Sequence, residues 1–281
     1  MSLPRPLLGI LFAVCSASVA SAQDPPYYVT YHHYLEERGS LEIAVAATTG
    51  LPKRGHRAYT APYLELEYGV TGWWTTELYV EGVTTRGDGN GFTGWRFENR
   101  FRPLKTEHRI NPVLYVEYEN INEASRIQKE IVGAGGVPFE PIRDLRAEHA
   151  HEIEGKIILS SAIGKWNVSE NFIVEKNLSE DEGFEFGYAF GVARPLGGLA
   201  RAASCRLCAE NFAIGAEVFG GLGSSEAFER SEQRHYIAPV VGWRIAPQAA
   251  IKGSVGFGLT NASDRYLIRV GIAYELPVGR R

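Results

Sequence analysis

The chain has 281 residues, of which 44% are hydrophobic and 22% are charged, and its formal net charge is −4. This mildly acidic balance, without a basic patch, argues against a nucleic-acid partner. No segment beyond the N-terminal stretch is long and apolar enough to be a transmembrane helix.

The N-terminus has the pattern of an export signal. A positive start precedes an apolar run from Leu7 to Val14, and small residues end at Ala20-Ser21-Ala22. This pattern predicts a cleavable signal peptide over residues 1–22. The alternative, a membrane anchor helix, is disfavoured because the apolar run is too short to span a bilayer. The mature chain then begins near Gln23 and leaves the cytoplasm.

Residues 23–39 are irregular and rich in tyrosine and histidine. We expect a periplasmic lead-in to the first strand, with a short plug as the alternative. His32 and His33 could ligate a metal, but adjacent side chains point in different directions in regular structure. We therefore interpret them as polar aromatics at a membrane interface and expect neither a metal nor a cofactor.

From Ser40 onward the sequence alternates between apolar and polar residues, which is the pattern of β-strands with two unlike faces. The clearest example is Trp95–Arg102, where aromatic residues alternate with arginine and glutamate. In chain order, the stretches with this pattern are Leu41–Ala47, Leu64–Val70, Glu77–Glu81, Trp95–Arg102, Leu114–Glu119, Glu152–Leu159, Trp166–Asn177, Phe184–Val192, Phe212–Val218, His235–Ile245, Ile251–Leu259 and Tyr266–Glu275. Glu170 interrupts the apolar face of Trp166–Asn177, and His235–Ile245 has no assignable face.

These stretches predict an all-β fold. It is a closed, antiparallel, up-and-down transmembrane β-barrel of about twelve strands over residues 40–276, followed by a short tail over 277–281. In a bilayer the apolar faces contact lipid, and the sheet must close because an unpaired backbone group cannot be hydrated there. A soluble sandwich with its charged faces outward is the alternative. An exported chain with recurring apolar strand faces favours the barrel and a bacterial outer membrane.

The connections fit this topology. With both chain ends in the periplasm, the turns after even-numbered strands lie on the periplasmic side and are short. This predicts periplasmic turns at Thr71-Gly72, Ile163-Gly164 and Ala246-Pro247-Gln248. The longest stretch without alternation, Ile121–Ala150, then lies outside the cell as a loop.

The charged residues on the polar strand faces are the candidate functional residues, and we expect them to line the lumen. They are Glu65, Glu67, Glu77, Glu81, Arg96, Glu98, Arg100, Arg102, Glu117, Glu119, Glu152, Glu154, Lys156 and Arg269. The arginines fall between acidic strands, so cross-strand pairing is expected. These charges either fill a narrow interior with salt bridges or line an aqueous path and set its selectivity. Because a barrel of this size lies between small, filled barrels and large, open porins, we favour a narrow or gated path.

The signal for catalysis is weak. A barrel hydrolase needs a nucleophile within hydrogen-bond reach of a base, and the candidates are all near one predicted strand: His149, His151, Ser160 and Ser161. No Gly-x-Ser-x-Gly motif surrounds the serines. We therefore interpret these four residues as polar residues at a loop edge and expect no enzyme.

Cys205 and Cys208 form a Cys-x-x-Cys pair in a connection rich in small residues. The next residue is Ala209 rather than the histidine of a c-type haem site, and no second pair is present for zinc. A local disulfide is the expected state in an oxidising periplasm, with a redox role as the alternative.

Several short motifs are shared with a known family. They are Leu64–Thr71, His151–Ser160, Asn171–Asn177, Tyr236–Pro239, Gly258–Thr260 and Arg269–Leu276. In their order along the chain they resemble the outer-membrane barrels associated with the MetA-pathway of phenol degradation. The resemblance covers most of the mature chain and implies a porin-like barrel that passes aromatic or hydrophobic compounds. It supplies no catalytic residues.

The sequence therefore favours an outer-membrane channel or transporter for small molecules. Its expected partners are outer-membrane lipid, the barrel-assembly machinery and a small-molecule solute. A sealed structural or surface-interaction barrel is the alternative, and a lipid-modifying enzyme is a third hypothesis.

Overall fold

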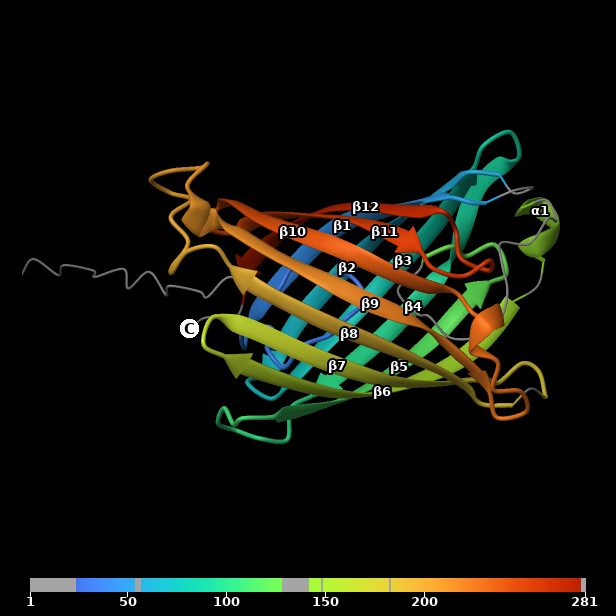
Figure 1. Cartoon of the computed structure of the whole chain (residues 1–281), viewed down its shortest axis with the longest axis horizontal. Coiled ribbons are helices and arrows are strands. Elements are labelled where there is room, and N and C mark those ends of the chain that lie inside the picture. Colours follow the sequence, from blue (N-terminus) through green and yellow to red (C-terminus); the bar gives the residue numbers. More distant parts are fainter. Residues whose placement is uncertain (1–23, 54–56, 128–141, 148, 182, 279–281) are drawn as a thin grey trace, which may run out of the picture.

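Twelve antiparallel strands form one closed barrel, in which consecutive strands pair and β12 pairs with β1 (Figure 1). The computed structural model describes residues 24–53, 57–127, 142–147, 149–181 and 183–278. The strands are β1 (Ser40–Leu51), β2 (Tyr59–Thr71), β3 (Trp74–Thr85), β4 (Gly89–Phe101), β5 (Asn111–Asn122), β6 (His149–Ile163), β7 (Trp166–Asn177), β8 (Glu185–Pro195), β9 (Phe212–Ser224), β10 (His235–Ala246), β11 (Ala249–Gly258) and β12 (Tyr266–Pro277). The predicted fold class is confirmed. The signal peptide predicted over residues 1–22 lies outside the described residues, as do residues 128–141 of the expected long loop.

The two ends of the barrel differ in their connections. We call the end where β1 begins and β12 ends the proximal rim, and the opposite end the distal rim. Two-residue turns join β2 to β3, β6 to β7 and β10 to β11 at the proximal rim, where short turns were expected. A one-turn helix, α1 (Ile142–Leu145), lies in the β5–β6 connection at the distal rim (Figure 1). None of the helices in the described part of the chain has the length and apolarity needed to cross a bilayer.

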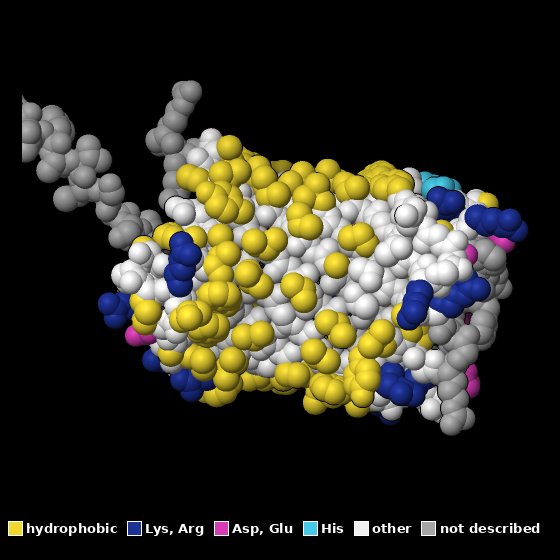
Figure 2. Space-filling model, turned by 90° about the horizontal axis from the view of Figure 1, so that it is seen from above, with side chains coloured by type: hydrophobic (Ala, Val, Ile, Leu, Met, Phe, Trp, Pro, Cys, Tyr) yellow, Lys and Arg dark blue, Asp and Glu magenta, His cyan; other side chains and the backbone are white. Residues whose placement is uncertain are grey.

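The outer surface of the barrel is apolar between the two rims. Outward residues such as Ile157, Phe172 and Val270 are each more than half exposed. Figure 2 shows this on one face, where lysine, arginine and acidic side chains gather at the two ends and hydrophobic side chains occupy the middle. Because a closed sheet leaves no strand edge unpaired, such a surface is suited to hydrocarbon. This is the distribution of a barrel embedded in a membrane.

One carboxylate breaks the apolar surface. Glu170 is exposed on the outer face of β7, directly opposite Leu159 on β6 and Phe190 on β8. No other aspartate or glutamate occupies an outward position in the strands that the structure describes. The irregularity noted in the sequence is therefore real, and the register of β7 places the carboxylate on the lipid-facing surface.

Replacing Glu170 with leucine is expected to stabilise the folded barrel by about 1–2 kcal/mol, because a lipid-facing carboxylate is unfavourable at membrane depth. Urea unfolding in lipid vesicles measures the change. Phe172→Leu, at the next outward position of the same strand, is the control and exchanges one apolar residue for another. An unchanged or lowered stability of Glu170→Leu would mean that a polar partner covers this position in the membrane.

Candidate functional site

A continuous row of glutamates crosses the inner face of the barrel from β12 through β1 to β8. Each member lies directly opposite the next in the strand register: Glu275, Glu42, Glu67, Glu77, Glu98, Glu117, Glu154, Glu175 and Glu185. We call these residues the glutamate row. Like charges directly opposite each other destabilise a sheet, so the row requires either compensating cations or a functional reason.

The glutamate row climbs from one rim to the other. Glu275 and Glu42 lie near the proximal ends of β12 and β1, and Glu117 lies in the middle of β5. Glu175 is near the distal end of β7, and Glu185 is the first residue of β8. The climb follows from the tilt of strands in a closed barrel, because a line perpendicular to tilted strands also rises along the barrel axis. The inner wall therefore carries carboxyl groups over the full height of the barrel.

Arg96 on β4 pairs with carboxylates on both neighbouring strands. Its Nη1 lies 3.1 Å from Oε1 of Glu117, and its Nε contacts Glu81. The guanidinium carbon is 4.7 Å from the centre of the Tyr79 ring. The side chains of Arg96, Glu81 and Glu117 are at most 1% exposed. These charges are enclosed by protein, where an ion pair is screened far less than at a surface.

Arg100 on β4 forms ion pairs with three members of the glutamate row. Its Nη2 is 2.5 Å from Oε1 of Glu67 and also contacts Glu77. Its Nε is 3.0 Å from Oε1 of Glu98. On β6, the Nζ of Lys156 is 2.6 Å from Oε1 of Glu154. The middle of the row is thus paired with cations.

The remaining predicted lumen residues fall into three groups. Glu119 is buried on the inner face, and Glu65 and Glu152 are half-buried there. Arg269 is buried on β12 with its guanidinium carbon 5.0 Å from the centre of the Phe219 ring, away from the Arg96 and Arg100 pairs. Arg102 lies beyond the end of β4.

Arg102 differs from the prediction because β4 ends at Phe101. The backbone N–H of Arg102 donates to the carbonyl of Trp73, at 2.9 Å, and its Nη2 donates to the carbonyl of Gly72, at 3.3 Å. The side chain is therefore held at the turn between β2 and β3. Arg102 belongs to the proximal rim rather than to the middle of the lumen.

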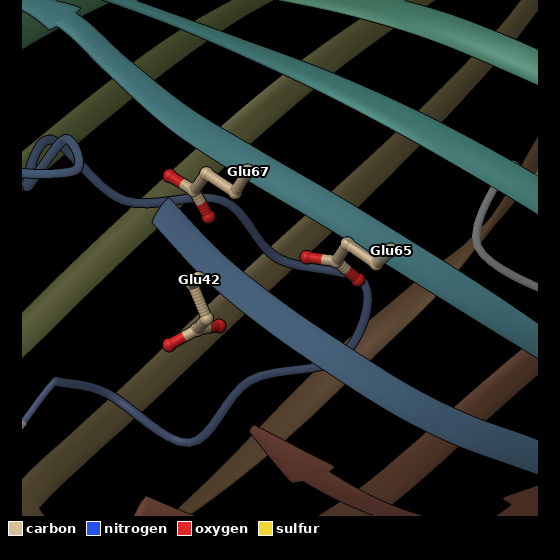
Figure 3. A group of neighbouring side chains, drawn as sticks. All are labelled: Glu42, Glu65 and Glu67. Atoms are coloured by element: carbon tan, nitrogen blue, oxygen red, sulfur yellow. The ribbon is translucent and has the colours of Figure 1, made fainter. Parts of the chain in front are cut away.

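Near the proximal rim three carboxylates lie close together. Glu42 on β1 and Glu65 and Glu67 on β2 point into the barrel (Figure 3), and their nearest carboxylate oxygens all lie within 4.8 Å of one another. A cavity of about 140 Å³ adjoins them, with Tyr28 and Lys252 also in its lining. This cavity has room for several water molecules and lies beside the proximal part of the glutamate row.

Residues 24–39, which we call the inner segment, run mostly inside the barrel rather than in the periplasm as the expected lead-in, with Asp24, Glu37 and Arg38 exposed. The hydroxyl of Tyr31 donates to Glu98 on β4, at 2.7 Å, and that of Tyr27 donates to Oδ1 of Asn167 on β7, at 3.1 Å. Because these strands stand on different sides of the barrel, the segment between them must cross the lumen (Figure 1). The short plug considered as the alternative has this geometry.

Glu217 on β9 holds the backbone of the inner segment. Its carboxylate accepts N–H groups from three consecutive residues: Tyr28 at 3.0 Å, Val29 at 2.8 Å and Thr30 at 2.7 Å. The Glu217 side chain is fully buried. Hydrogen bonds to a buried charged group are among the strong ones, because both partners would otherwise be left without water. Glu217 is therefore the main anchor of the segment.

Asn171 on β7 forms a second anchor. Its Oδ1 accepts the backbone N–H of Tyr31, at 2.6 Å, and its Nδ2 donates to the carbonyl of the same residue, at 3.0 Å. An extended segment without strand neighbours must satisfy its backbone groups through side chains when it is buried. Glu217 and Asn171 fulfil this requirement and fix the segment against β7 and β9.

Glycine on the inner face of β8 makes room for a tyrosine ring of the segment. A Cβ added to Gly191 would lie 2.7 Å from Cε1 of Tyr27. Gly191→Ala is therefore expected to weaken docking of the inner segment by about 1–3 kcal/mol, as overpacking does. Faster proteolytic cleavage of residues 24–39 in the folded barrel is the readout.

The matched control is Gly253→Ala on β11. A Cβ at Gly253 would meet Cγ1 of Val241 at 3.7 Å, an ordinary contact. Its cleavage rate should stay at the wild-type value. Equal cleavage of both alanine variants would show that the Tyr27 ring does not depend on the space at Gly191.

The structure contains a serine–histidine pair, His33 with Ser160, that was not among the predicted pairs. Nδ1 of His33, in the inner segment, is 2.8 Å from Oγ of Ser160, which also accepts from Nδ2 of Asn167 at 3.0 Å. Burial lowers the pKa of His33, and Glu107, 3.6 Å from its Nε2, opposes this shift. His33 is 1% exposed and Ser160 is fully buried. With both groups enclosed, the pair fixes the inner segment against β6.

The other catalytic candidates do not join this pair. His149, His151 and Ser161 occupy the outward positions of β6, on the opposite face from Ser160. Nδ1 of His151 is 2.6 Å from the hydroxyl of Tyr118 on the outer surface. The four candidate residues therefore lie on two faces of the barrel wall, Ser160 on the inner face and the other three on the outer face.

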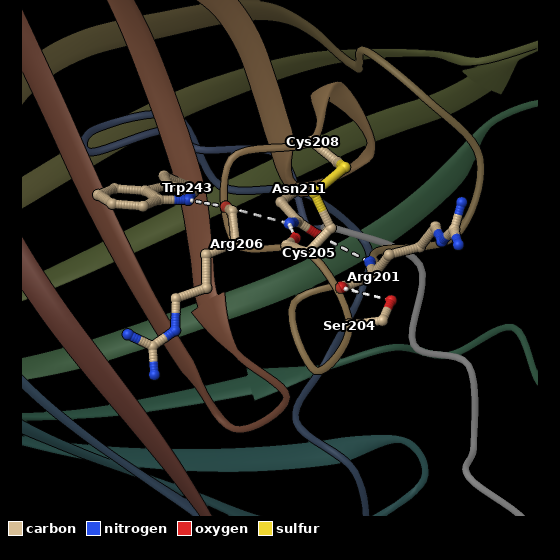
Figure 4. The surroundings of a disulfide bond; sticks show 7 residues. All are labelled: Arg201, Ser204, Cys205, Arg206, Cys208, Asn211 and Trp243. Carbon is tan, nitrogen blue, oxygen red and sulfur yellow. Dashed lines mark hydrogen bonds between the residues drawn. A yellow bond between two sulfur atoms is a disulfide. The ribbon is translucent and has the colours of Figure 1, made fainter.

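A disulfide joins Cys205 and Cys208 in the connection between β8 and β9 at the proximal rim (Figure 4). The side chain of Asn211, fully buried, closes this connection by donating to the carbonyl of Arg206, at 3.2 Å. Its Oδ1 accepts the backbone N–H of Arg201, at 2.6 Å. The cysteines therefore belong to an ordered loop outside the lumen.

Sequence comparison finds no protein-family model and no curated protein that matches this chain. The resemblance to the phenol-degradation family therefore remains an expectation. Comparison with solved structures finds proteins of similar fold.

The chain is similar in fold to the COG4313 outer membrane channel from Pseudomonas putida F1, with a TM-score of 0.52 and 12% identity over 86% of this chain and 97% of that one. It is also similar to the NanC porin, with a TM-score of 0.49 and 11% identity over 84% of this chain and all of the other. A third match, the CymD monoaromatic hydrocarbon channel, has a TM-score of 0.42 and 9% identity over 85% of this chain and 88% of that one. At these identities the likeness is one of fold alone.

Proposed function

We propose that this protein is an outer-membrane channel for small molecules, in which solutes move along the glutamate row and the inner segment closes the path. The observation that carries this proposal is the unbroken register of carboxylates from the proximal to the distal rim. Directly opposed glutamates reduce the stability of a sheet. A line of glutamates that spans the whole wall is better explained by a role in solute passage than by a contribution to folding stability.

The charge of the row predicts selectivity for cations over anions. Rings of acidic side chains favour cations in channels, because they replace part of the hydration of the passing ion. Arg96, Arg100 and Lys156 compensate part of the negative charge in the middle of the row, and Glu42 and Glu185 lie toward its two ends. Cationic and neutral solutes are therefore the expected cargo.

The inner segment supports closure rather than a permanent seal. It is part of the chain but not of the wall. It is held by hydrogen bonds to side chains such as Glu217 and Asn171 and by the packing of its rings, without strand pairing. A segment held in this way can leave when its anchors are loosened. In this proposal the proximal rim faces the periplasm, and the signal peptide and the barrel-assembly machinery deliver the chain.

The aromatic or hydrophobic solutes implied by the family resemblance form a finer part of this proposal. The space closed by the segment is occupied by the rings of Tyr27, Tyr28 and Tyr31. A solute that replaces the segment meets a lumen shaped around aromatic rings. Flux of benzylamine should therefore exceed that of an aliphatic amine of equal size.

A sealed structural barrel is the second candidate, and the burial of the interior favours it. Glu98 and Glu154, in the middle of the row, are fully buried in this structure. In that case the ion pairs hold the wall together, and the outer loops carry any function.

Conductance in planar bilayers separates the two candidates. A variant of the mature chain without residues 24–35 should give larger and longer openings than the wild type, with higher permeability to potassium than to chloride. Adding Glu185→Gln and Glu42→Gln to that variant should reduce the cation preference. A folded deletion variant that conducts nothing would support the sealed barrel, and one that prefers chloride would remove the role of the glutamate row.

A further inference from the structure

A disulfide and a buried asparagine cross-link the connection between β8 and β9, residues 196–211, which we call the cysteine loop. The disulfide and the Asn211 side chain together tie Arg201, Cys205 and Arg206 into a compact unit (Figure 4). Such a loop presents its exposed side chains in a constant arrangement, so less ordering entropy is lost when they bind a partner.

The cysteine loop is attached to the outer side of the barrel wall. The indole Nε1 of Trp243 donates to the carbonyl of Arg206, at 2.9 Å. Trp243 stacks on Phe212, with ring centres 5.7 Å apart and an angle of 7° between the planes. Both rings occupy outward positions, two residues along from the exposed Val241 and Ile214. The loop therefore continues the lipid-facing surface at the proximal rim.

The loop combines exposed leucines with unpaired arginines. Leu196, Leu199 and Leu207 are 42%, 57% and 75% exposed. Arg201 and Arg206 are exposed, and neither forms an ion pair with any residue that the structure describes. Within this loop the opposing charge is Glu210, which is half-buried.

A third arginine stands beside the loop on the wall. Arg194 projects outward from the proximal end of β8, with its guanidinium carbon 5.2 Å from the centre of the Trp166 ring. Trp166 and Trp243 lie near the proximal ends of β7 and β10, and tryptophan is enriched at the membrane boundary in barrels of this type. Arginine at this level meets the phosphate groups of lipids, and leucine next to it meets the upper part of the acyl chains.

We propose that the cysteine loop and Arg194 bind the headgroups of anionic phospholipids in the leaflet at the proximal rim. The guanidinium groups of Arg201 and Arg206 extend to opposite sides of the loop (Figure 4). Each therefore binds a separate phosphate, because the planar donor fork of arginine matches phosphate oxygens. Leu199 and Leu207 insert beside the acyl chains. Continuity with the lipid-facing surface favours lipid over a protein partner, which would need a surface turned away from the bilayer.

Native mass spectrometry of the full mature chain, released from nanodiscs, tests this proposal. The probes are phosphatidylglycerol and phosphatidylcholine. The wild type should retain phosphatidylglycerol in preference, and Arg201→Ala with Arg206→Ala should weaken that retention by about fivefold for each arginine. Arg230→Ala with Arg265→Ala, at the distal rim, is the matched control and should retain the wild-type preference. Unchanged retention in the first variant, or an equal loss in the control, would overturn the proposal.

A photo-crosslinking residue at Leu207 gives an independent readout in native membranes. Cross-links to phospholipid support the proposal, whereas cross-links to a protein alone would show that the loop serves a protein partner. Cys205→Ser with Cys208→Ser, which frees the loop while leaving the arginines in place, should reduce the preference for phosphatidylglycerol. An unchanged preference in that variant would contradict the requirement for a fixed loop.

Discussion

Glu217→Ala is expected to free the inner segment from the lumen and to raise the open fraction of the channel roughly a hundredfold. The Glu217 carboxylate accepts three backbone N–H groups at 2.7 to 3.0 Å and is fully buried. A hydrogen bond to a charged group contributes about 1.5–3 kcal/mol, so even with water replacing part of the loss, about 3 kcal/mol of docking free energy disappears. Single-channel recording and limited proteolysis of residues 24–39 measure the effect.

The conservative variant and a surface variant make this prediction specific. Glu217→Gln keeps one acceptor oxygen and should give an intermediate open fraction. Glu226→Ala, in the exposed connection after β9, removes the same charge without touching the segment and should behave as wild type. If the segment stays protected from protease in Glu217→Ala, the closure rests on its tyrosine side chains rather than on its backbone.

The fold could be predicted from the sequence because a lipid-facing strand has two unlike faces. The alternation around Phe186 and Tyr188 or Ile268 and Val270 is a local pattern, and no distant contact is needed to interpret it. Closure then follows from the absence of water in hydrocarbon. Even the exception, Glu170, was visible as an interruption of the pattern.

Part of the glutamate row could also have been found from the turns. Glu154 and Glu175 are equally distant from the two-residue turn between β6 and β7, and they are paired in the structure. Applying that geometry would have added Glu175 to the predicted residues, and pairing β12 with β1 would have added Glu42 and Glu275. The alternation alone shows which face a residue occupies, but not which residue it meets.

The rest of the row depends on bulges that the sequence does not reveal. The register of β2 with β3 shifts between Gly69 and Thr71, and that of β3 with β4 shifts between Glu81 and Gly82. Each bulge moves every later pair by one residue. Without them Glu77 would not face Glu98, and the row would be broken at its centre.

The sequence left two alternatives for the inner segment, a lead-in or a short plug, because the segment has no periodicity. Its position is determined by single long-range contacts, such as those of Glu217 and Asn171, from strands more than a hundred residues away in sequence. His33 and Ser160 meet for the same reason. Tyrosine-rich sequence after a signal peptide is consistent both with a membrane interface and with a lumen, and composition does not distinguish them.

Arg96→Ala is expected to cause the largest loss of stability, about 3–5 kcal/mol, because it leaves Glu81 and Glu117 buried without this guanidinium. Both carboxylates are at most 1% exposed. Urea unfolding of the reconstituted barrel at neutral pH measures the loss. It should shrink as the pH falls, since a protonated carboxyl group needs no counter-ion.

The stability of a triple variant without these charges, Arg96→Met with Glu81→Gln and Glu117→Gln, shows whether the interior is dry or hydrated. In a dry interior, removing all three charges returns the stability close to that of wild type, because the desolvation of the charges disappears with them. In a wet interior, water already solvates Glu81 and Glu117, and Arg96→Ala alone costs less than about 1 kcal/mol. A small loss in Arg96→Ala would therefore mean that the middle of the glutamate row is hydrated even while the inner segment is docked, and that solutes can reach it without release of the segment.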